Sequence, residues 1–418
     1  MLVTGLLAYK RADRKGEMNA KSGAKSGAIL AALGIILVAL NLRTAVAGLS
    51  PIYDTIDFDI GLGIDARAVL GSLPPLGFVL GGLITPRIAK RIGLEWNLVF
   101  LLALMAVGHL IRGFAPNWQT IAFGSSLVLI GSGMGNISLP PVVKRYFPHR
   151  IGAMSSTYIA FVSIGSIIPP LIAVPLSDST SWRFALGSWV LFAVAASLPW
   201  LFEIRGGHHS VERNRSASAK QKLAMHRSPT AWAVALTLGI ASIIGYGCFA
   251  WLPDIAKDAA GMNEAQGGFM LAIFTASGLP TALGIPYLAA RMKNVSILIY
   301  IGVALIIFGA LAFIFIPTTA PYLWSYIFGT GPLLFPLALV LINLRTESPA
   351  ASLQLSAFAQ FIGYSIAALV APLMGLARAL TGNWNLALGA MAASTLVAVW
   401  AGIVLSRNHT VESELRVT

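Results

Sequence analysis

Long apolar runs alternate with short polar segments along almost the whole chain. A helix needs about 20 apolar residues to cross the ~30 Å hydrocarbon core of a membrane, and runs of about that length occur twelve times. The predicted spans are 28–52, 68–88, 95–115, 119–142, 151–175, 184–203, 230–252, 267–289, 295–316, 321–342, 352–376 and 384–406. The pattern therefore predicts an all-α membrane protein with twelve transmembrane helices.

The composition supports a lipid-embedded fold and excludes a soluble one. Of the 418 residues, 56% are hydrophobic and only 11% are charged, against about 25% charged residues in an average soluble domain. The chain also contains 41 glycines and 22 prolines, which transmembrane helices tolerate better than soluble helices do. A soluble chain with this net charge of +13 would suggest a nucleic-acid ligand, but here the location of the charges gives another explanation.

The basic residues lie overwhelmingly on one side of the predicted membrane. If both termini share a side, that side holds 23 Lys and Arg residues and the other side holds five, while Arg43 lies between them. Basic loops stay in the cytoplasm, so both termini are predicted to be cytoplasmic, in a plasma membrane of the bacterial inner-membrane type. The high net charge is then a signal of orientation, and no nucleic-acid partner is expected.

The twelve spans divide into two related sets of six. A polar, basic stretch at 205–228 separates a first half at 28–204 from a second half at 229–406, with tails at 1–27 and 407–418. The hexapeptide WRFALG begins at Trp182 and WNLALG at Trp384, 202 positions later, and the prolines of TPRIAKR and IPYLAAR lie 200 apart. Matches at a constant offset indicate an internal repeat, and hence a pseudo-symmetric 6+6 architecture.

The tetrapeptide NLRT occurs twice, but not at the repeat offset. Its copies begin at 41 and 343, which are 302 positions apart. The repeat instead pairs Arg345 with Arg145, a charge in a cytoplasmic loop, and pairs Arg43 with the uncharged region near Gly245. The two arginines are therefore not equivalent.

Arg43 is the one Lys, Arg, Asp or Glu that the pattern places deep in a span. It lies about 22 Å along a helix from Ala28 and about 16 Å before Asp54. Because an arginine near mid-bilayer costs at least ~2.5–3.5 kcal/mol, it should face a cavity or a partner. It either reaches helix-end carbonyls or the interface, or it binds an anion, for which the planar guanidinium is well suited. The anion site is the sharper hypothesis, since no carboxylate is predicted near it.

Other polar residues within the spans are candidates for the same cavity. Gln360 and Tyr364 are four residues apart and hence on one helix face, and membrane-buried polar side chains need partners from either helices or a substrate. The predicted substrate-binding set is Arg43, Asn136, Tyr246, Trp251, Gln360 and Tyr364. Basic residues of the cytoplasmic loops set the orientation and are candidates for gates between the halves: Arg87, Arg91, Lys144, Arg145, Arg291 and Arg345.

Several kinds of catalytic site have no sequence signal in this chain. It contains no H-E-x-x-H motif, no phosphate-binding G-x-x-x-x-G-K-[ST] motif and no pair of carboxylates within the predicted spans. Each of these would be needed for a zinc protease, an ATP-driven pump or a carboxylate proton relay, respectively. We therefore expect no enzymatic activity, no metal and no cofactor. His109 is a candidate proton carrier, although nothing selects it.

Four segments resemble a known family. They are LNLRTAVAGLSPI from Leu40, GNISLPPVVKRYFPHRIGAMSSTY from Gly135, WLPDI from Trp251 and LSAFAQFIGYSIAALVAPLMG from Leu355. With twelve spans, a central linker and a 6+6 repeat, the chain resembles the major facilitator superfamily, and within it the cyanate permease and 2-nitroimidazole transporter group. The resemblance implies a transporter that works by alternating access, with its site between the halves.

The predicted function is secondary transport of a small anion, such as cyanate or an organic acid, by a monomer in the lipid bilayer, with a proton as a candidate co-transported ion. One alternative is a drug exporter of the same superfamily, acting on nitroimidazole-like compounds. A second is a membrane receptor that transports nothing, against which the absence of any soluble domain counts.

Overall fold

The computed structural model describes residues 28–147, 150–205 and 223–417, and within these it is entirely helical. Twelve of its helices are long and apolar enough to cross a membrane, which confirms the predicted fold class. The N-terminal tail and most of the predicted linker lie outside the described residues.

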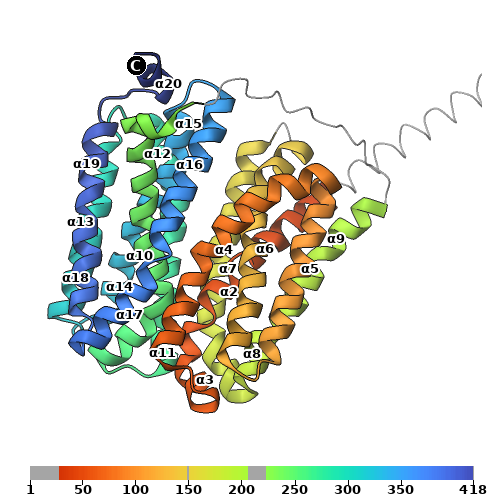
Figure 1. Ribbon diagram of the computed structural model, residues 1–418, viewed down its shortest axis with the longest axis vertical. Helices are drawn as coiled ribbons and strands as arrows, with labels where there is room; N and C mark the ends of the chain where they lie inside the picture. The colour runs from red at the N-terminus through yellow and green to blue at the C-terminus, as the bar shows by residue number, and fades with distance from the viewer. Residues whose placement is uncertain (1–27, 148–149, 206–222, 418) are drawn as a thin grey trace, which may run out of the picture.

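Helices that precede residue 205 form the first of two bundles (Figure 1). The chain begins with a helix at 28–41. It continues with α2 (Thr44–Ala47), η1 (Ser50–Ile52), α3 (Tyr53–Ile60), α4 (Gly63–Ile92), α5 (Leu94–Gly113), α6 (Trp118–Tyr146), α7 (Ile151–Ser179), α8 (Trp182–Gly187) and α9 (Trp189–Arg205).

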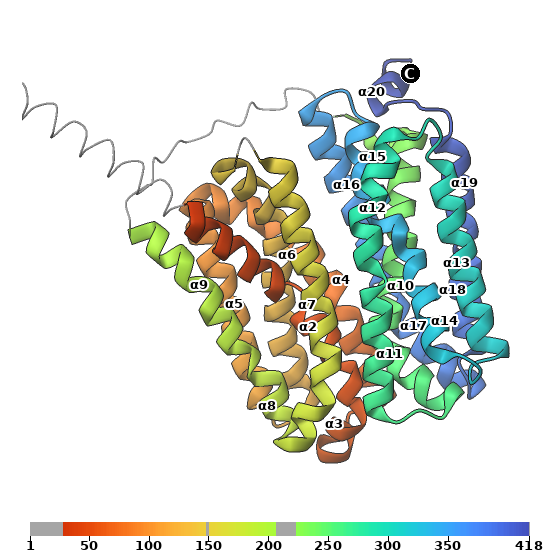
Figure 2. The same cartoon turned by 180° about the vertical axis from the view of Figure 1, so that it is seen from behind.

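Helices that follow residue 223 form the second bundle, which Figure 2 shows from behind. They are η2 (Met225–Arg227), α10 (Pro229–Ala260), α11 (Glu264–Ala276), α12 (Gly278–Arg291), α13 (Ser296–Phe315), α14 (Pro321–Thr330), η3 (Gly331–Leu333), α15 (Leu334–Leu344), α16 (Pro349–Ala367), α17 (Val370–Thr381), α18 (Asn385–Ser394), α19 (Leu396–Leu405) and α20 (Val411–Val417).

The two bundles meet at one end of the molecule and diverge at the other (Figure 1). We call the end that holds Arg205 and α20 the terminal end, and the opposite end, which holds α3 and α8, the far end. Near the far end the backbones approach closely, because a Cβ on Gly71 of α4 would lie 2.6 Å from the Cβ of Ala250 in α10 and 2.7 Å from that of Ala371 in α17. Only glycine permits this approach between the bundles.

Helix one is broken twice on its way across the bundle. The helix at 28–41 ends in a turn at Leu42 and Arg43, and two bends at Gly48 and Leu49 separate α2 from η1. Irregular backbone at membrane depth is found where it lies inside protein or lines a cavity. The first break therefore indicates that the backbone around Arg43 lies inside the protein or lines a cavity.

Candidate functional site

The first break of helix one is held by its own polar side chains. The Asn41 amide donates to the carbonyls of Leu37 (2.8 Å) and of Phe192 in α9 (3.2 Å), while the Thr44 hydroxyl donates to the Asn41 carbonyl (3.0 Å). Asn41 and Thr44 are buried, with 1% and 3% of their surface exposed. The Thr44 bond satisfies a carbonyl at the open end of the broken helix, and the Asn41 amide ties the break to α9, so side chains of the break itself hold the turn at Arg43 in place.

A close helix contact secures the same turn from the other side. A Cβ on Gly165 of α7 would lie 2.3 Å from the carbonyl oxygen of Leu40. Any larger residue at 165 would push helix one away from α7. The backbone at the break is thus clamped between α7 and α9.

The Arg43 side chain extends from this turn toward the second bundle. Its guanidinium carbon lies 4.8 Å from the ring centroid of Phe78 in α4, a cation–π geometry. Nη1 donates to the Tyr246 hydroxyl of α10 at 3.4 Å, which is long for a hydrogen bond. Arg43 therefore lies where the two bundles face each other, and most of its donor capacity is unused by these two contacts.

Three aromatic rings pack together beside the guanidinium. The ring centroids of Phe78 and Tyr246 are 6.0 Å apart, those of Phe78 and Tyr364 5.7 Å, and those of Tyr246 and Tyr364 6.2 Å. Phe249 continues the group at 6.3 Å from Tyr246. Because Phe78 comes from the first bundle and the others from the second, this aromatic cluster joins the bundles around Arg43. Nothing in the sequence separates Phe78 from the other apolar residues of its span.

Within the described residues, no carboxylate forms an ion pair with Arg43. The guanidinium is partly buried and carries five N–H donors in a fixed fork. A cation in a low-dielectric position is costly unless an opposite charge compensates it. The site is thus electrostatically suited to a transient negative charge.

The other predicted binding residues have different surroundings. The Nδ2 atom of Asn136 is buried without a hydrogen-bond partner in the described part of the chain, and its neighbour Gly135 packs on Leu42, next to Arg43. Gln360 donates to the Ser356 hydroxyl at 2.8 Å, one turn before Tyr364. Both remain candidates on the evidence of the sequence.

Trp251 is not brought to this cluster. Its indole N–H donates to the carbonyl of Ala371 at 2.9 Å, and its ring packs 5.2 Å from that of Trp384. The residue is 1% exposed. Its polar atom is satisfied and its ring is enclosed, so the structure supports a packing role in place of the predicted contact with substrate.

Charged residues at the far end tie the bundles together. Arg67 of α4 donates to Asp254 of α10 at 2.7 Å and to Asp54 and Asp57 of α3 at 2.9 and 3.2 Å. Lys257 forms a second ion pair across the interface, with Asp54. The acidic segment after span one and the charges after span seven were visible in the sequence, but not their pairing across the bundles.

Three of the predicted gating residues at the terminal end contact their own bundle. Arg145 pairs with Glu95 of its own bundle at 3.1 Å, Arg87 donates to the Leu83 carbonyl one turn earlier, and the Arg291 guanidinium lies over the neighbouring Tyr287 ring. Arg91 and Lys144 are exposed.

Arg345 lies in the turn after α15, as the sequence predicted, but its side chain is buried there. It is 6% exposed and donates to the Leu405 carbonyl and to Asn408 Oδ1, each at 2.7 Å. It therefore attaches the end of α15 to the end of α19. This use differs from that of Arg43, in agreement with the inequivalence of the two NLRT segments.

Other charged side chains are also buried in the bundles, but they lie at helix ends: Glu95 and Arg112 in the first and last turns of α5, and Glu203 near the end of α9. Arg112, assigned from the sequence to the far side of the membrane, is 0% exposed, and Glu95 and Glu203 are each 4% exposed. Glu95 is neutralised by Arg145 and also accepts from the Tyr146 hydroxyl at 3.0 Å. Arg112 forms none of the ion pairs seen among the described residues.

The sequence repeat has a structural counterpart at the far end. The indole of Trp182 donates to Asp59 at 2.9 Å, and that of Trp384 donates to Asp258 at 2.9 Å. In each case an arginine adds an ion pair to the same aspartate: Arg183 in the first bundle and Arg378 in the second. The two hexapeptides therefore occupy corresponding positions in the two bundles.

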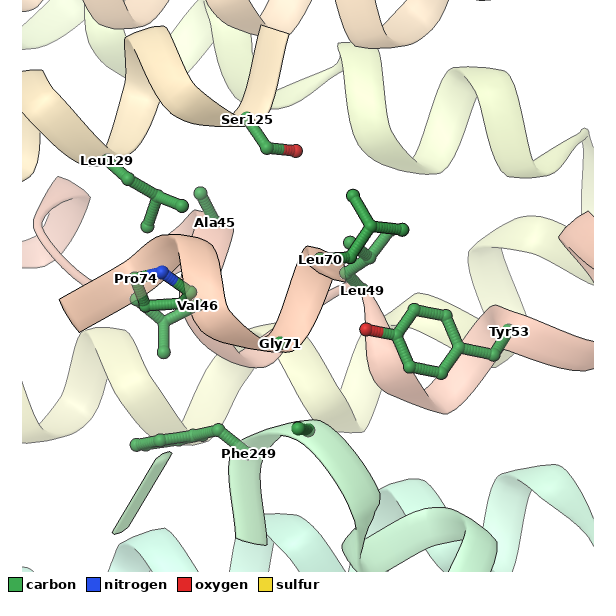
Figure 3. A pocket seen from close by; sticks show the side chains of 11 residues that line it. Ala45, Val46, Leu49, Tyr53, Leu70, Gly71, Pro74, Ser125, Leu129 and Phe249 are labelled. Carbon is green, nitrogen blue, oxygen red and sulfur yellow. The ribbon is translucent and has the colours of Figure 1, made fainter. Parts of the chain in front are cut away.

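A small pocket is lined in part by residues 45–53, which follow Arg43 in the first membrane span (Figure 3). Its walls include Ala45 and Val46 just beyond Arg43, Tyr53 at the start of α3, Ser125 of α6 and Phe249 of α10. The hydroxyl groups of Ser125 and Tyr53 both point toward it. The pocket thus has walls from both bundles and lies next to the aromatic cluster.

Comparison with known proteins identifies the family. The model of the Major Facilitator Superfamily matches residues 32–368. The chain belongs to this superfamily. A 2-nitroimidazole transporter of Escherichia coli (strain K12) is 31% identical over 90% of this chain and 95% of its own length. Cyanate transport protein CynX of the same organism is 28% identical over 84% of this chain and 91% of its own.

The fold also matches a solved structure. A bacterial homologue of the human lysosomal transporter Spinster, solved in an inward-facing and unoccupied conformation, superposes with a TM-score of 0.67 at 13% identity. The match covers 94% of this chain and 98% of that one. The family match, the transporter relatives and the twelve apolar helices together make this protein a multi-pass membrane transporter of the Major Facilitator Superfamily.

Proposed function

We propose that this protein is a secondary active transporter of a small anion, and that it works by alternating access. The observation that carries the proposal is Arg43: a guanidinium at a built helix break, between the bundles, with no carboxylate paired to it in the described chain. A substrate carboxylate or a comparable anion supplies the missing charge. The name of the cyanate transport relative agrees with an anionic substrate.

The two halves, 28–204 and 229–406, are the moving units of this mechanism. The ion pairs that bridge them, Arg67–Asp254 and Lys257–Asp54, lie at the far end, whereas the helices of the two bundles diverge toward the terminal end (Figure 1). We assign the terminal end to the cytoplasm of a bacterial-type cell, because basic residues are in excess there. On this assignment, the arrangement of the bundles corresponds to an inward-facing state.

Each residue around Arg43 has a definite role in this scheme. The guanidinium binds the anion through its fork of N–H donors, and the Phe78 ring holds the guanidinium in place from one face. Tyr246 and Tyr364 close the site from the second half and orient the substrate through their hydroxyls, with Asn136 and Gln360 as further hydrogen-bonding partners. When the halves rock, Arg43 and Phe78 move relative to Tyr246 and Tyr364, so access to the anion changes side.

A second candidate function is export of neutral, flat aromatic compounds. The aromatic cluster favours it, since offset or edge-to-face ring packing stabilises such ligands, and the 31% identical relative is named for a 2-nitroimidazole. In this case Arg43 serves mainly to hold the aromatic rings.

A thermal-unfolding screen of the purified protein separates the two functions. Sodium cyanate, sodium benzoate and neutral 2-nitroimidazole are tested with wild type, with Arg43→Ala and with Arg87→Ala, an exposed control arginine of α4. Anion transport predicts that an anion raises the unfolding temperature and that only Arg43→Ala abolishes the shift. Stabilisation by 2-nitroimidazole alone, retained in Arg43→Ala, would establish the second function instead.

A further inference from the structure

The C-terminal helix α20 lies at the terminal end of the second bundle (Figure 1) and is fastened to the start of α16 through Glu412. Its Oε1 atom accepts from the backbone N–H groups of Glu347 and Ser348, at 3.0 and 2.9 Å, and from the Ser348 hydroxyl at 3.1 Å. Ser348 is the N-cap of α16, and Glu412 is only 7% exposed. Because the free N–H groups of a helix start favour a negative charge, this is a charge-assisted contact.

Glu414, two residues later, makes the same kind of contact with the start of α10. Its carboxylate accepts from the Thr230 N–H at 3.2 Å, from the Thr230 hydroxyl at 2.7 Å and from the Ser228 hydroxyl. Ser228 is the N-cap of α10, and a proline follows it, as one follows the N-cap of α16. Two helices with the same Ser-Pro start are therefore held by two glutamates of one short helix.

Residues 408–417, which include α20 and which we call the clip, are also anchored to other parts of the second bundle. The Val411 N–H donates to the Arg345 carbonyl at 2.9 Å, and Val411 is 0% exposed. Arg345 Nη2 donates to Asn408 Oδ1 at 2.7 Å, and Asn408 Nδ2 donates to the Lys293 carbonyl at 3.2 Å. The clip thus has a fixed place from which its two carboxylates hold the helix starts.

The two fastened helices are the ones that carry the tyrosines of the candidate site. Tyr246 lies 18 residues after the N-cap of α10, and Tyr364 lies 16 residues after that of α16, which is about 27 and about 24 Å along a helix. Beyond its first residue, neither helix contains a proline before its tyrosine, and proline is the commonest cause of a kink. The relative level of the two caps therefore sets the relative level of the two tyrosines.

The same helices remain in contact next to the site. A Cβ on Gly363 of α16 would lie 3.2 Å from the backbone nitrogen of Gly239 in α10 and 2.4 Å from the Leu238 Cδ2 atom. The ring centroids of Tyr246 and Tyr364 are 6.2 Å apart. These contacts are apolar, whereas the contacts at the caps are charge-assisted. The clip therefore supplies the polar attachment that joins α10 to α16 at the terminal end.

We propose that the clip positions Tyr246 against Tyr364 in the substrate site, by holding the starts of α10 and α16 at a fixed level. Glu412 and Glu414 are the positioning residues, and they act from the terminal end without touching the substrate. Release of the clip lets the two helices slide past each other, which disturbs the hydroxyl groups that orient the anion beside Arg43. The inference rests on the proposed function only where transport is measured, because the tyrosines can be observed without a substrate.

Hydrogen exchange tests whether the two glutamates fasten the helix starts. In the full-length double variant Glu412→Ala/Glu414→Ala, the amides at the starts of α10 and α16 should exchange about tenfold faster or more, as expected for the loss of a hydrogen bond to a charged group. The control His409→Ala, at an exposed position of the clip, should leave these rates unchanged. Unchanged rates in the double variant would overturn the proposal, because the carboxylates would then not hold the caps.

Fluorine NMR of protein labelled with fluorotyrosine tests whether the release reaches the site. The signals of Tyr246 and Tyr364 are assigned by replacing each residue with phenylalanine, and so is that of Tyr326 in α14, which is 46% exposed. The double variant should shift the signals of Tyr246 and Tyr364 and leave that of Tyr326 unchanged, whereas His409→Ala should shift none of the three. Faster exchange at the caps with unchanged signals of Tyr246 and Tyr364 would also overturn the proposal.

Uptake of radioactive benzoate into liposomes measures the consequence for transport. The double variant should show a higher KM and a nearly unchanged kcat, because the tyrosines orient the bound anion while the halves still move as before. An unchanged KM would contradict a role of the clip in substrate binding. If the wild type takes up no anion, the proposed function fails, while the exchange rates and the fluorine signals still decide whether the clip positions the tyrosines.

Discussion

The ion pair between Arg67 and Asp254 should control the equilibrium between the two access states. Both side chains are mostly buried, at 10% and 15% exposed, so solvent screens their interaction little. Arg67→Gln removes this contact across the bundles, while the Lys257–Asp54 pair remains. The bonds of Arg67 to Asp54 and Asp57 lie within one bundle and are available in either state, so their loss should not change the equilibrium.

The size of the effect follows from the one bond that depends on closure. A hydrogen bond to a charged group is worth about 1.5–3 kcal/mol, which is about 10- to 150-fold in the equilibrium constant between the closed and open far end. The full cost of removing one partner from a buried pair is larger, about 3–5 kcal/mol, and the rest of it appears as lower overall stability.

Distances between spin labels provide the assay. Labels are attached at Gln119→Cys and Asn383→Cys, two exposed far-end positions on opposite bundles, with the buried Cys248 replaced by alanine. Arg67→Gln should populate a longer distance. The matched control is Arg183→Gln, which removes an arginine–aspartate pair within one bundle at the same end and should leave the distances unchanged. Identical distance distributions in Arg67→Gln and wild type would refute the reasoning.

Three further predictions test the remaining parts of the account. Gly165→Ala places a Cβ against the Leu40 carbonyl and should destabilise the protein by about 1–3 kcal/mol. The control Gly284→Ala, where a Cβ meets nothing, should leave stability unchanged. Equal unfolding temperatures of the two variants would contradict the close contact of α7 with the helix break. Phe78→Leu removes the cation–π contact, worth about 0.5–2 kcal/mol, and should raise the substrate dissociation constant by about 2- to 30-fold in a titration. Tyr246→Phe removes one long hydrogen bond and should raise that constant less. A larger effect of Tyr246→Phe than of Phe78→Leu would be evidence against this geometry. Burial alone would raise the pKa of Glu412, but the backbone N–H groups of Glu347 and Ser348 that donate to its carboxylate outweigh this and hold the pKa below its usual 4.5. The stabilisation of α20 docking by the ionised Glu412 carboxylate is thus present above pH 4.5 and is lost as the pH falls through the lowered pKa. Hydrogen exchange of the α20 amides should therefore become faster at low pH in wild type, and this pH dependence should be absent in Glu412→Gln.

The sequence was sufficient for the features that depend on local pattern. Twelve apolar runs predicted the twelve membrane helices because the bilayer imposes length and hydrophobicity on each helix separately. Arg43 was identifiable because a charge far from both ends of an apolar run has few structural explanations. The hexapeptides at Trp182 and Trp384 revealed a repeat whose equivalent contacts, to Asp59 and Asp258, the structure shows.

Features that depend on how helices pack could not be predicted. Phe78 resembles any other apolar residue of a span until the bundle places it under Arg43. Arg112 lies three residues inside the predicted end of span three, near enough to the end to be assigned to the surface. It is buried because α8 packs closely on the end of α5: a Cβ on Gly187 of α8 would lie 3.0 Å from the Cα of Gly113. Trp251 was a candidate binding residue because its ring carries an N–H donor, but that N–H donates to the carbonyl of Ala371.

Transport by purified protein in liposomes tests the anion site most directly. Uptake of radioactive cyanate and benzoate is compared for wild type, Arg43→Lys, Arg43→Ala and the exposed control Arg407→Ala, with equal amounts of folded protein. Loss of a charge-assisted contact costs about 2–5 kcal/mol, so Arg43→Ala should reduce anion uptake at least about thirtyfold. Arg43→Lys should retain a small fraction, since it keeps the charge and loses the fork, and Arg407→Ala should match wild type. Full anion uptake by Arg43→Ala would contradict the account.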